Sequence, residues 1–274
     1  MSYDSSSASK KPLEGDDMSD HQGYENWKQW DEASFGQYSK AEALYFAAEL
    51  ERAGLHMQDG LRICEAGFGN GTFAGYVRSR GCDYYGSEIN GVLVERAQRL
   101  GFKASGTGLT GALGEQPHAT VDAVVAFDVL EHLDIAGIQS FLQETLMLLK
   151  PGGVLLARVP SGDSPFGRVI FHGDITHRTA LGSSAIRQLA ALVGFEVVDI
   201  GPPRLPLHGL GWIKTLRRAS IRMAQWALAL PINLVFHEGQ RRVITANLVF
   251  VLRKPLSTQM VGNPQSGMRA RTSR

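Results

Sequence analysis

The chain has 274 residues, of which 43% are hydrophobic and 20% charged, an ordinary composition for one large globular domain. Its formal net charge of +1 conceals an uneven distribution. Positions 201–274 hold 12 Lys and Arg against one acid, Glu238, whereas the first 200 residues hold 16 basic and 26 acidic residues. This asymmetry indicates either an anionic partner for the C-terminal part or attraction between the two parts of the chain.

Cysteine usage and the two chain ends point to the cytoplasm. Cys64 and Cys82 lack metal-ligand spacing and are expected to be free thiols in a reducing compartment. Residues 1–23 are polar with no signal-peptide core, and residues 255–274 are also polar, so both are expected to be disordered tails. No apolar run reaches the ~18 residues required to cross a bilayer. We therefore expect a cytoplasmic protein with one domain over 24–254.

Strand and helix patterns alternate along this domain. The capping-box sequence Ser39-Lys-Ala-Glu42 predicts a helix to about Arg52. The predicted strands are 61–66, 83–88, 102–104, 121–127, 154–159, 195–200 and 243–252. The predicted helices between them are 72–80, 90–100, 136–149 and one capped by Ser183 that ends at Gly194, with Lys150-Pro-Gly-Gly as a turn. The alternation predicts a doubly wound α/β fold.

A glycine-rich loop follows the first predicted strand and is expected to bind a nucleoside. Residues 61–71 read Leu-Arg-Ile-Cys-Glu-Ala-Gly-Phe-Gly-Asn-Gly, and glycines allow close backbone approach at the edge of a parallel sheet. Position 72 is Thr, where a dinucleotide fingerprint requires glycine or alanine. Glu65 would repel a pyrophosphate but would pair with the ammonium group of an amino acid. The loop therefore favours S-adenosylmethionine over NAD.

This loop resembles motif I of the class I S-adenosylmethionine-dependent methyltransferases, Glu/Asp-x-Gly-x-Gly-x-Gly, at Glu65, Gly67, Gly69 and Gly71. The resemblance covers about 61–200 and resumes at the last predicted strand. It implies a mostly parallel, seven-stranded sheet whose last strand is antiparallel, with S-adenosylmethionine as the cofactor. In the family a short link joins strands six and seven, whereas this chain has an insertion over 201–242.

The resemblance also implies which residues contact the cofactor. Glu88 corresponds to the acid that accepts hydrogen bonds from both ribose hydroxyls, with Ile89 beside the adenine. Residues 121–132 resemble the fourth-strand motif that borders the methionine part. Many relatives bind the adenine amino group with an acid after the third strand, and in its place this chain offers Ser105, Gly106 or backbone groups. The predicted cofactor residues are Glu65, Gly67, Phe68, Gly69, Gly71, Glu88, Ile89, Ser105, Gly106, Asp128, Val129 and Leu130.

Histidines near the acceptor are the candidates for chemistry, because a hydroxyl acceptor benefits from a general base. His132, after the fourth strand, is expected to accept a proton or to shape the site. Asp174-Ile-Thr-His177 resembles a loop in bacterial methyltransferases associated with surface-glycan and other secondary biosynthesis. His177 could be the base, oriented by Asp174, or could tie this loop to the sheet. A divalent metal held by His172, Asp174 and His177 is the third reading, disfavoured because carboxylate ligands are sparse.

An aromatic-rich stretch, Tyr24, Trp27, Trp30, Phe35 and Tyr38, opens the segment 24–60. We expect it to be a lid over cofactor and acceptor, or an arm packed on the core.

The insertion contains a predicted amphipathic helix, 212–230. Its apolar stripe is Trp212, Leu216, Ala219, Met223, Trp226 and Leu230, and its basic residues are Lys214, Arg217, Arg218 and Arg222. Pro231 is expected to end it. The helix could pack on the domain, join a homodimer, or lie on the anionic inner face of a membrane. No nucleic acid is expected, because the basic residues are interleaved with apolar ones.

We predict methyl transfer from S-adenosylmethionine to a small-molecule or glycan acceptor, at oxygen, in bacterial surface-glycan or secondary biosynthesis. An acceptor on the membrane, such as a lipid or quinone precursor, is the alternative. Functions of other classes are a non-catalytic binding protein that keeps the fold, and an oxidoreductase.

Overall fold

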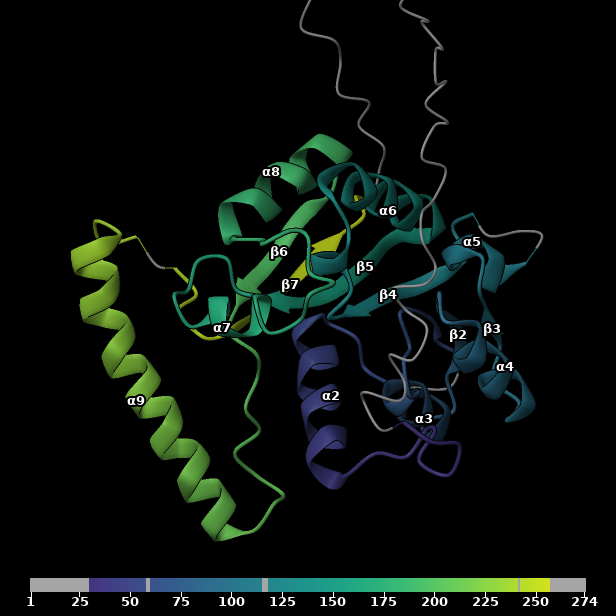
Figure 1. Cartoon of the computed structure of the whole chain (residues 1–274), viewed down its shortest axis with the longest axis horizontal. Helices are drawn as coiled ribbons and strands as arrows, with labels where there is room; N and C mark the ends of the chain where they lie inside the picture. The colour runs from purple at the N-terminus through teal and green to yellow at the C-terminus, as the bar shows by residue number, and fades with distance from the viewer. Residues whose placement is uncertain (1–29, 58–59, 115–117, 241, 257–274) are drawn as a thin grey trace, which may run out of the picture.

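The structure is a computed structural model that describes residues 30–57, 60–114, 118–240 and 242–256 (Figure 1). The predicted N-terminal tail and the C-terminal tail after Leu256 lie outside these residues, as do Tyr24 and Trp27.

Seven strands form one sheet in the order β3-β2-β1-β4-β5-β7-β6. They are β1 (Arg62–Ala66), β2 (Asp83–Ser87), β3 (Ala104–Ser105), β4 (Val121–Phe127), β5 (Leu149–Pro160), β6 (Glu196–Gly201) and β7 (Asn247–Arg253). Strands β1 to β5 pair in parallel, and β7 lies antiparallel between β5 and β6. The predicted fold, with its antiparallel last strand, is confirmed.

Helices cover both faces of the sheet (Figure 1). They are α2 (Lys40–Arg52), α3 (Thr72–Ser79), α4 (Gly91–Arg99), α5 (Gly108–Leu113), the short 3-10 helix η2 (Leu130–His132), α6 (Ile135–Leu148), α7 (Gly167–Phe171), α8 (Ser183–Val193) and α9 (Trp212–Phe236). Because strand side chains alternate between faces, Ile63 packs with α2, α3 and α4, while its neighbour Cys64 packs with α5, α6 and α8. Both cysteines are buried, and they form no disulfide with each other.

Helix α2 begins as its sequence predicts. The Ser39 hydroxyl accepts a hydrogen bond from the Glu42 backbone N–H at 3.2 Å, and the Glu42 carboxylate accepts one from the Ser39 backbone N–H at 2.7 Å. These two bonds complete a capping box and fix the helix that borders the candidate site.

Other local predictions need correction. The turn expected at Lys150-Pro-Gly-Gly lies inside β5, where a register shift between Val121 and Ala123 of β4 accommodates it. Ser183 does not cap α8: Gly182 is the cap residue, and the Asp163 carboxylate accepts the Ser183 N–H at 3.1 Å instead. The short helices α5, η2 and α7 were not predicted, because segments of three to six residues carry little periodic signal.

Helix α9 confirms the predicted insertion between β6 and β7 but differs from the prediction in two ways. Pro231 lies inside the helix, which continues to Phe236, and the Asn233 side-chain oxygen accepts the Arg242 N–H at 3.0 Å near its C-terminal end. No residue of α9 is buried, so the predicted packing onto the domain is wrong. The helix stands apart from the sheet and its covering layers (Figure 1).

Candidate active site

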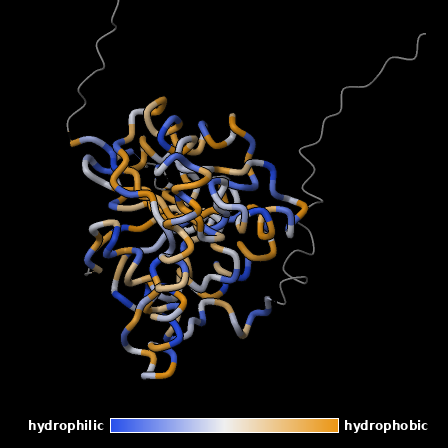
Figure 2. The backbone as a smooth tube through the Cα atoms, turned by 90° about the vertical axis from the view of Figure 1, so that its left-hand side faces the viewer, coloured by the Kyte–Doolittle hydropathy of each residue, from blue (hydrophilic) through white to orange (hydrophobic). Residues whose placement is uncertain are grey.

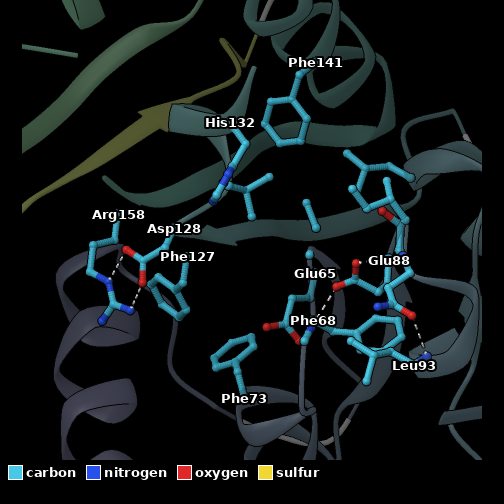
Figure 3. A pocket seen from close by; sticks show the side chains of 18 of the residues that line it. Glu65, Phe68, Phe73, Glu88, Leu93, Phe127, Asp128, His132, Phe141 and Arg158 are labelled. Atoms are coloured by element: carbon cyan, nitrogen blue, oxygen red, sulfur yellow. Dashed lines mark hydrogen bonds and ion pairs between the residues drawn. The ribbon is translucent and has the colours of Figure 1, made fainter. Parts of the chain in front are cut away.

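A cavity of about 720 Å³ opens at the carboxyl ends of β1, β2 and β4, where ligands bind in doubly wound sheets. Eight predicted cofactor residues line it: Glu65, Gly67, Phe68, Gly69, Glu88, Ile89, Asp128 and Val129. Figure 3 shows Asp128 at one end of the cavity and Glu88 at the other, with Glu65 between them. One loop and two strand ends, distant in sequence, therefore form one site.

Four predicted cofactor residues do not line the cavity. Gly71 is the N-cap residue of α3, and Leu130 is buried in the core. Ser105 and Gly106 lie beyond the cavity wall, with the Ser105 hydroxyl bonded to Thr107 at 2.9 Å. On this side Leu109 of α5 and Phe141 of α6 form the wall instead.

The glycine loop is shaped by the chain itself. Gly69 has a φ of +52°, and a Cβ there would lie 2.8 Å from the Trp30 ring. A Cβ on Gly71, with a φ of +68°, would lie 2.6 Å from the Phe35 ring. The glycines therefore provide left-handed backbone and room for the aromatic arm. Because Trp30 also lines the cavity, the described part of the arm both packs on the core and contributes to the site.

Glu65 is a buried acid at the centre of the site. Its side chain accepts a hydrogen bond from the Tyr84 hydroxyl at 2.7 Å, and the residue is 4% exposed. Burial raises the pKa of Glu65 to about 8, and the nearby Glu88 carboxylate adds to this rise, while the Tyr84 bond opposes it. An incoming cation would favour the ionised form.

Glu88 ties the end of β2 to the glycine loop. One carboxylate oxygen accepts the Gly69 N–H at 3.0 Å and the other accepts the Asn90 N–H at 3.1 Å. These bonds hold the carboxylate at the cavity wall in a fixed orientation (Figure 3).

The sequence analysis missed Arg158, which binds Asp128 at the end of the cavity. Its Nε donates to Asp128 at 2.9 Å, its Nη2 donates to the other carboxylate oxygen, and its Nη1 donates to the Tyr45 hydroxyl at 3.2 Å. Asp128 has a φ of +58°, a rare conformation that Asp tolerates better than most residues. A lone charge within the apolar run Val154–Val159 was the available signal for Arg158.

The cavity lining is strongly acidic. Its acidic and basic side chains among the described residues are Glu42, Glu65, Glu88, Asp128, Glu144 and Arg158. Five carboxyl groups against one guanidinium favour a cationic ligand and disfavour a pyrophosphate. S-adenosylmethionine, with a sulfonium and an ammonium group, fits this lining, and NAD does not.

The two candidate histidines occupy different positions relative to the cavity. His132 lines the cavity, whereas His177 is absent from its lining. Asp174 accepts a hydrogen bond from the Thr176 hydroxyl at 2.6 Å, and that hydroxyl lies 2.8 Å from His132 Nδ1. Because the hydroxyl hydrogen goes to Asp174, the Thr176 oxygen accepts from His132, and Nε2 of the neutral ring is the unprotonated nitrogen. Asp174 therefore orients His132 through Thr176.

His177 supports the wall behind His132. Its Nδ1 donates to the Phe171 carbonyl at 2.8 Å, and its ring meets that of His132 edge-on, with 4.7 Å between centroids. Partial burial raises the pKa of Asp174, but the hydrogen bonds from Thr176 outweigh this effect and lower it overall. These contacts join the loop to α7 and to the short helix η2 that follows β4.

The structure brings together a different set of possible metal ligands from the predicted set of His172, Asp174 and His177. Ligand atoms of Glu131, His132 and His177 all lie within 4.8 Å of one another, a spacing that one divalent ion could bridge. Burial raises the pKa of Glu131 to about 8, and neither of its carboxylate oxygens has a hydrogen-bond partner among the described residues. The sequence analysis gave Glu131 no role.

Comparisons with known proteins agree with this geometry. A family model described as a methyltransferase domain matches residues 18–200. A "Probable S-adenosylmethionine-dependent methyltransferase" of Mycolicibacterium smegmatis is 31% identical over 159 residues, 53% of this chain and 55% of the relative. The chain thus spans about half the length of this curated relative.

Solved structures share the fold. A S-adenosylmethionine-dependent methyltransferase of Archaeoglobus fulgidus aligns with a TM-score of 0.55 at 16% identity, over 77% of this chain and 94% of that one. The 1,6-didemethyltoxoflavin N1-methyltransferase of Burkholderia thailandensis, solved with S-adenosylhomocysteine, aligns with a TM-score of 0.50 at 16% identity, over 86% and 84% of the two chains.

Proposed function

Because the chain belongs to the family of S-adenosylmethionine-dependent methyltransferase domains, we propose that it methylates a small-molecule or glycan acceptor at oxygen. One observation supports oxygen as the methylated atom: hydrogen bonds link Asp174 to Thr176 and Thr176 to His132. They leave the second nitrogen of the neutral His132 ring, which lines the cavity, unprotonated. A hydroxyl acceptor loses a proton on methylation, and a histidine base can accept it.

The acidic lining supports a proposed binding position for each part of the cofactor. Glu65 would bind the ammonium group, Glu88 the ribose hydroxyls, and Asp128 would border the methionine part. S-adenosylmethionine, when bound, would supply its sulfonium methyl group: the acceptor oxygen would bond to the methyl carbon as the carbon–sulfur bond breaks, with the neutral thioether as the leaving group. His132 takes the hydroxyl proton, and the apolar walls formed by Phe127 and Phe141 exclude water.

Labelled transfer tests this proposal. The protein and S-adenosylmethionine carrying a ¹³C methyl group are incubated with the small-molecule and glycan fraction of cells that lack the protein. We expect label in that fraction, with the carbon chemical shift of a methyl ether or ester, and a much slower rate of labelling after His132→Ala, although the variant still binds cofactor. Label on nitrogen or carbon would contradict the oxygen assignment.

A membrane-associated acceptor is a second candidate, favoured by the exposed apolar residues of α9. Transfer of label to the chloroform-extractable fraction instead of the aqueous fraction would favour a membrane-associated acceptor. The non-catalytic alternative predicts cofactor binding, measured by calorimetry, with no transfer to any fraction.

A further inference from the structure

Helix α9 exposes large apolar side chains that a folded domain normally covers. The exposed fraction is 77% for Trp212, 71% for Met223 and Trp226, and 75% for Phe236. None of its 25 residues is buried, and its side of the molecule faces the viewer in Figure 2. A continuous exposed apolar surface of this length indicates a binding partner.

The two halves of α9 differ in chemistry. The first half carries Lys214, Arg217, Arg218 and Arg222 opposite the apolar stripe. The second half, 223–236, contains no charged residue and only Gln225 and Asn233 as strongly polar side chains, so it is apolar on nearly all sides. No acid occurs between positions 202 and 237. A cationic helix with tryptophans on its apolar face is complementary to an anionic lipid surface.

Length and composition alone would let α9 cross a bilayer, contrary to the sequence expectation, but the topology opposes a crossing. The uncharged half spans roughly 21 Å, short of the ~30 Å hydrocarbon layer. Gly201, where β6 ends, pairs with Val249 near the start of β7, so both linkers of α9 return to one end of the sheet. After a crossing, the linker 237–246 would have to recross hydrocarbon without helical hydrogen bonds, which lipid does not tolerate. The helix therefore fits a membrane surface.

The segment that leaves α9 is fixed beside a second apolar surface. The Ser164 hydroxyl donates to the Ile244 carbonyl at 2.6 Å. This bond holds the segment against the start of the α7 loop, residues 161–182, which contains α7 and joins β5 to α8. In that loop Val169 is 78% exposed and Ile175 is 99% exposed. Thr176, the next residue, contacts His132 of the candidate active site. A second exposed apolar surface thus lies beside the candidate active site.

We propose that α9 and the α7 loop dock this protein on an anionic phospholipid bilayer, with α9 lying in the plane of the headgroups. The apolar stripe of α9 and the side chains of Val169 and Ile175 enter the lipid interface, and the basic residues contact lipid phosphates. This docking is independent of the proposed acceptor chemistry, since it depends only on surface residues outside the cavity.

Vesicle sedimentation of the full chain tests the proposal. We expect binding to equimolar phosphatidylglycerol and phosphatidylcholine vesicles, and little binding to phosphatidylcholine alone. The variant Lys214→Glu/Arg217→Glu/Arg222→Glu retains Arg218, which donates to the Pro206 carbonyl at 2.8 Å. It should bind the anionic vesicles on the order of 100-fold more weakly, since each basic residue near the surface contributes about 5-fold.

A charge-matched control, Lys40→Glu/Arg80→Glu/Arg187→Glu, changes exposed basic residues elsewhere and should bind like the wild type. Trp226→Glu should weaken binding through the apolar face, with an unchanged melting temperature, because the residue is 71% exposed in the folded protein. Equal binding by the wild type and the α9 charge variant overturns the proposal. A second result would also overturn it: the wild type does not bind vesicles but forms a dimer in sedimentation velocity, and Trp226→Glu dissociates this dimer. A second copy of the chain would then cover α9.

Discussion

The Arg158 guanidinium on β5 forms a two-pronged ion pair with the Asp128 carboxylate, which directly follows β4. Adjacent parallel strands bring these residues together, and the Asp128 N–H also donates to the Arg158 carbonyl at 2.9 Å. The pair holds a left-handed residue at the methionine end of the cavity.

Removing Arg158 should weaken both folding and cofactor binding. Arg158→Ala leaves Asp128 without its cation, and we expect a loss of about 1–3 kcal/mol in the free energy of unfolding with at least about tenfold weaker S-adenosylmethionine binding. Arg158→Lys should recover part of each, because lysine keeps the charge without the planar fork. Urea unfolding and calorimetry measure the two effects. The control Arg62→Ala breaks a longer, more exposed pair with Asp83 and should change stability by less than about 1 kcal/mol.

Glu88→Ala should weaken S-adenosylmethionine binding by at least about tenfold, because charge-assisted hydrogen bonds to the ribose contribute about 1.5–3 kcal/mol each. The Gly69 N–H also loses its acceptor, which loosens the loop. Titration calorimetry measures the dissociation constant. The exposed Glu95 on α4 provides the matched control, and its Ala variant should bind normally. Unchanged binding by Glu88→Ala would count against the ribose assignment.

Cofactor binding should release a proton from Glu65. Because burial raises its pKa to about 8, this carboxyl is mostly protonated at pH 7 in the free protein. Pairing with an ammonium group favours the ionised form, so affinity should rise with pH up to about 8 and then level off. Calorimetry in buffers of different ionisation enthalpy should report about one proton released at pH 7. Release that persists in Glu65→Gln would assign the proton to another group.

Substitutions of His132 and His177 should have different effects on kcat. His132→Ala is expected to lower kcat by about 10²–10⁴ with little change in cofactor affinity, the range for loss of a general base. His177→Ala should cost less, because His177 acts through the wall behind His132.

Thr176→Val tests positioning, because it keeps the shape of the side chain but removes the bond to His132 Nδ1. It should lower kcat with little change in KM, and Thr176→Ser should restore activity. Loss of activity in His177→Ala equal to that in His132→Ala would return His177 to the role of base.

Glu131 should make stability depend on pH. Burial raises its pKa from 4.5 to about 8, so the folded state retains a proton that the unfolded state loses above about pH 4.5. Stability is therefore full below pH 4.5 and falls as pH rises toward 8, by at most about 1.4 kcal/mol per pH unit. In urea unfolding, Glu131→Gln should match the wild type near pH 5 and exceed it at pH 8. The exposed Glu51→Gln control should keep the wild-type slope.

The sequence by itself determined the sheet, the glycine loop and the position of Glu88. These features depend on local periodicity and on residues close together in the chain, and the sequence alone contains both kinds of information. The amphipathic character of α9 was also readable from residue spacing.

Only the tertiary structure decided what these residues touch. Strand adjacency pairs Arg158 with Asp128, and the loop after β5 brings Thr176 to His132. The exposure of α9 likewise depends on which surfaces the domain has already covered. Contacts between residues 30 to 44 positions apart follow from chain topology, which spacing along the sequence does not encode.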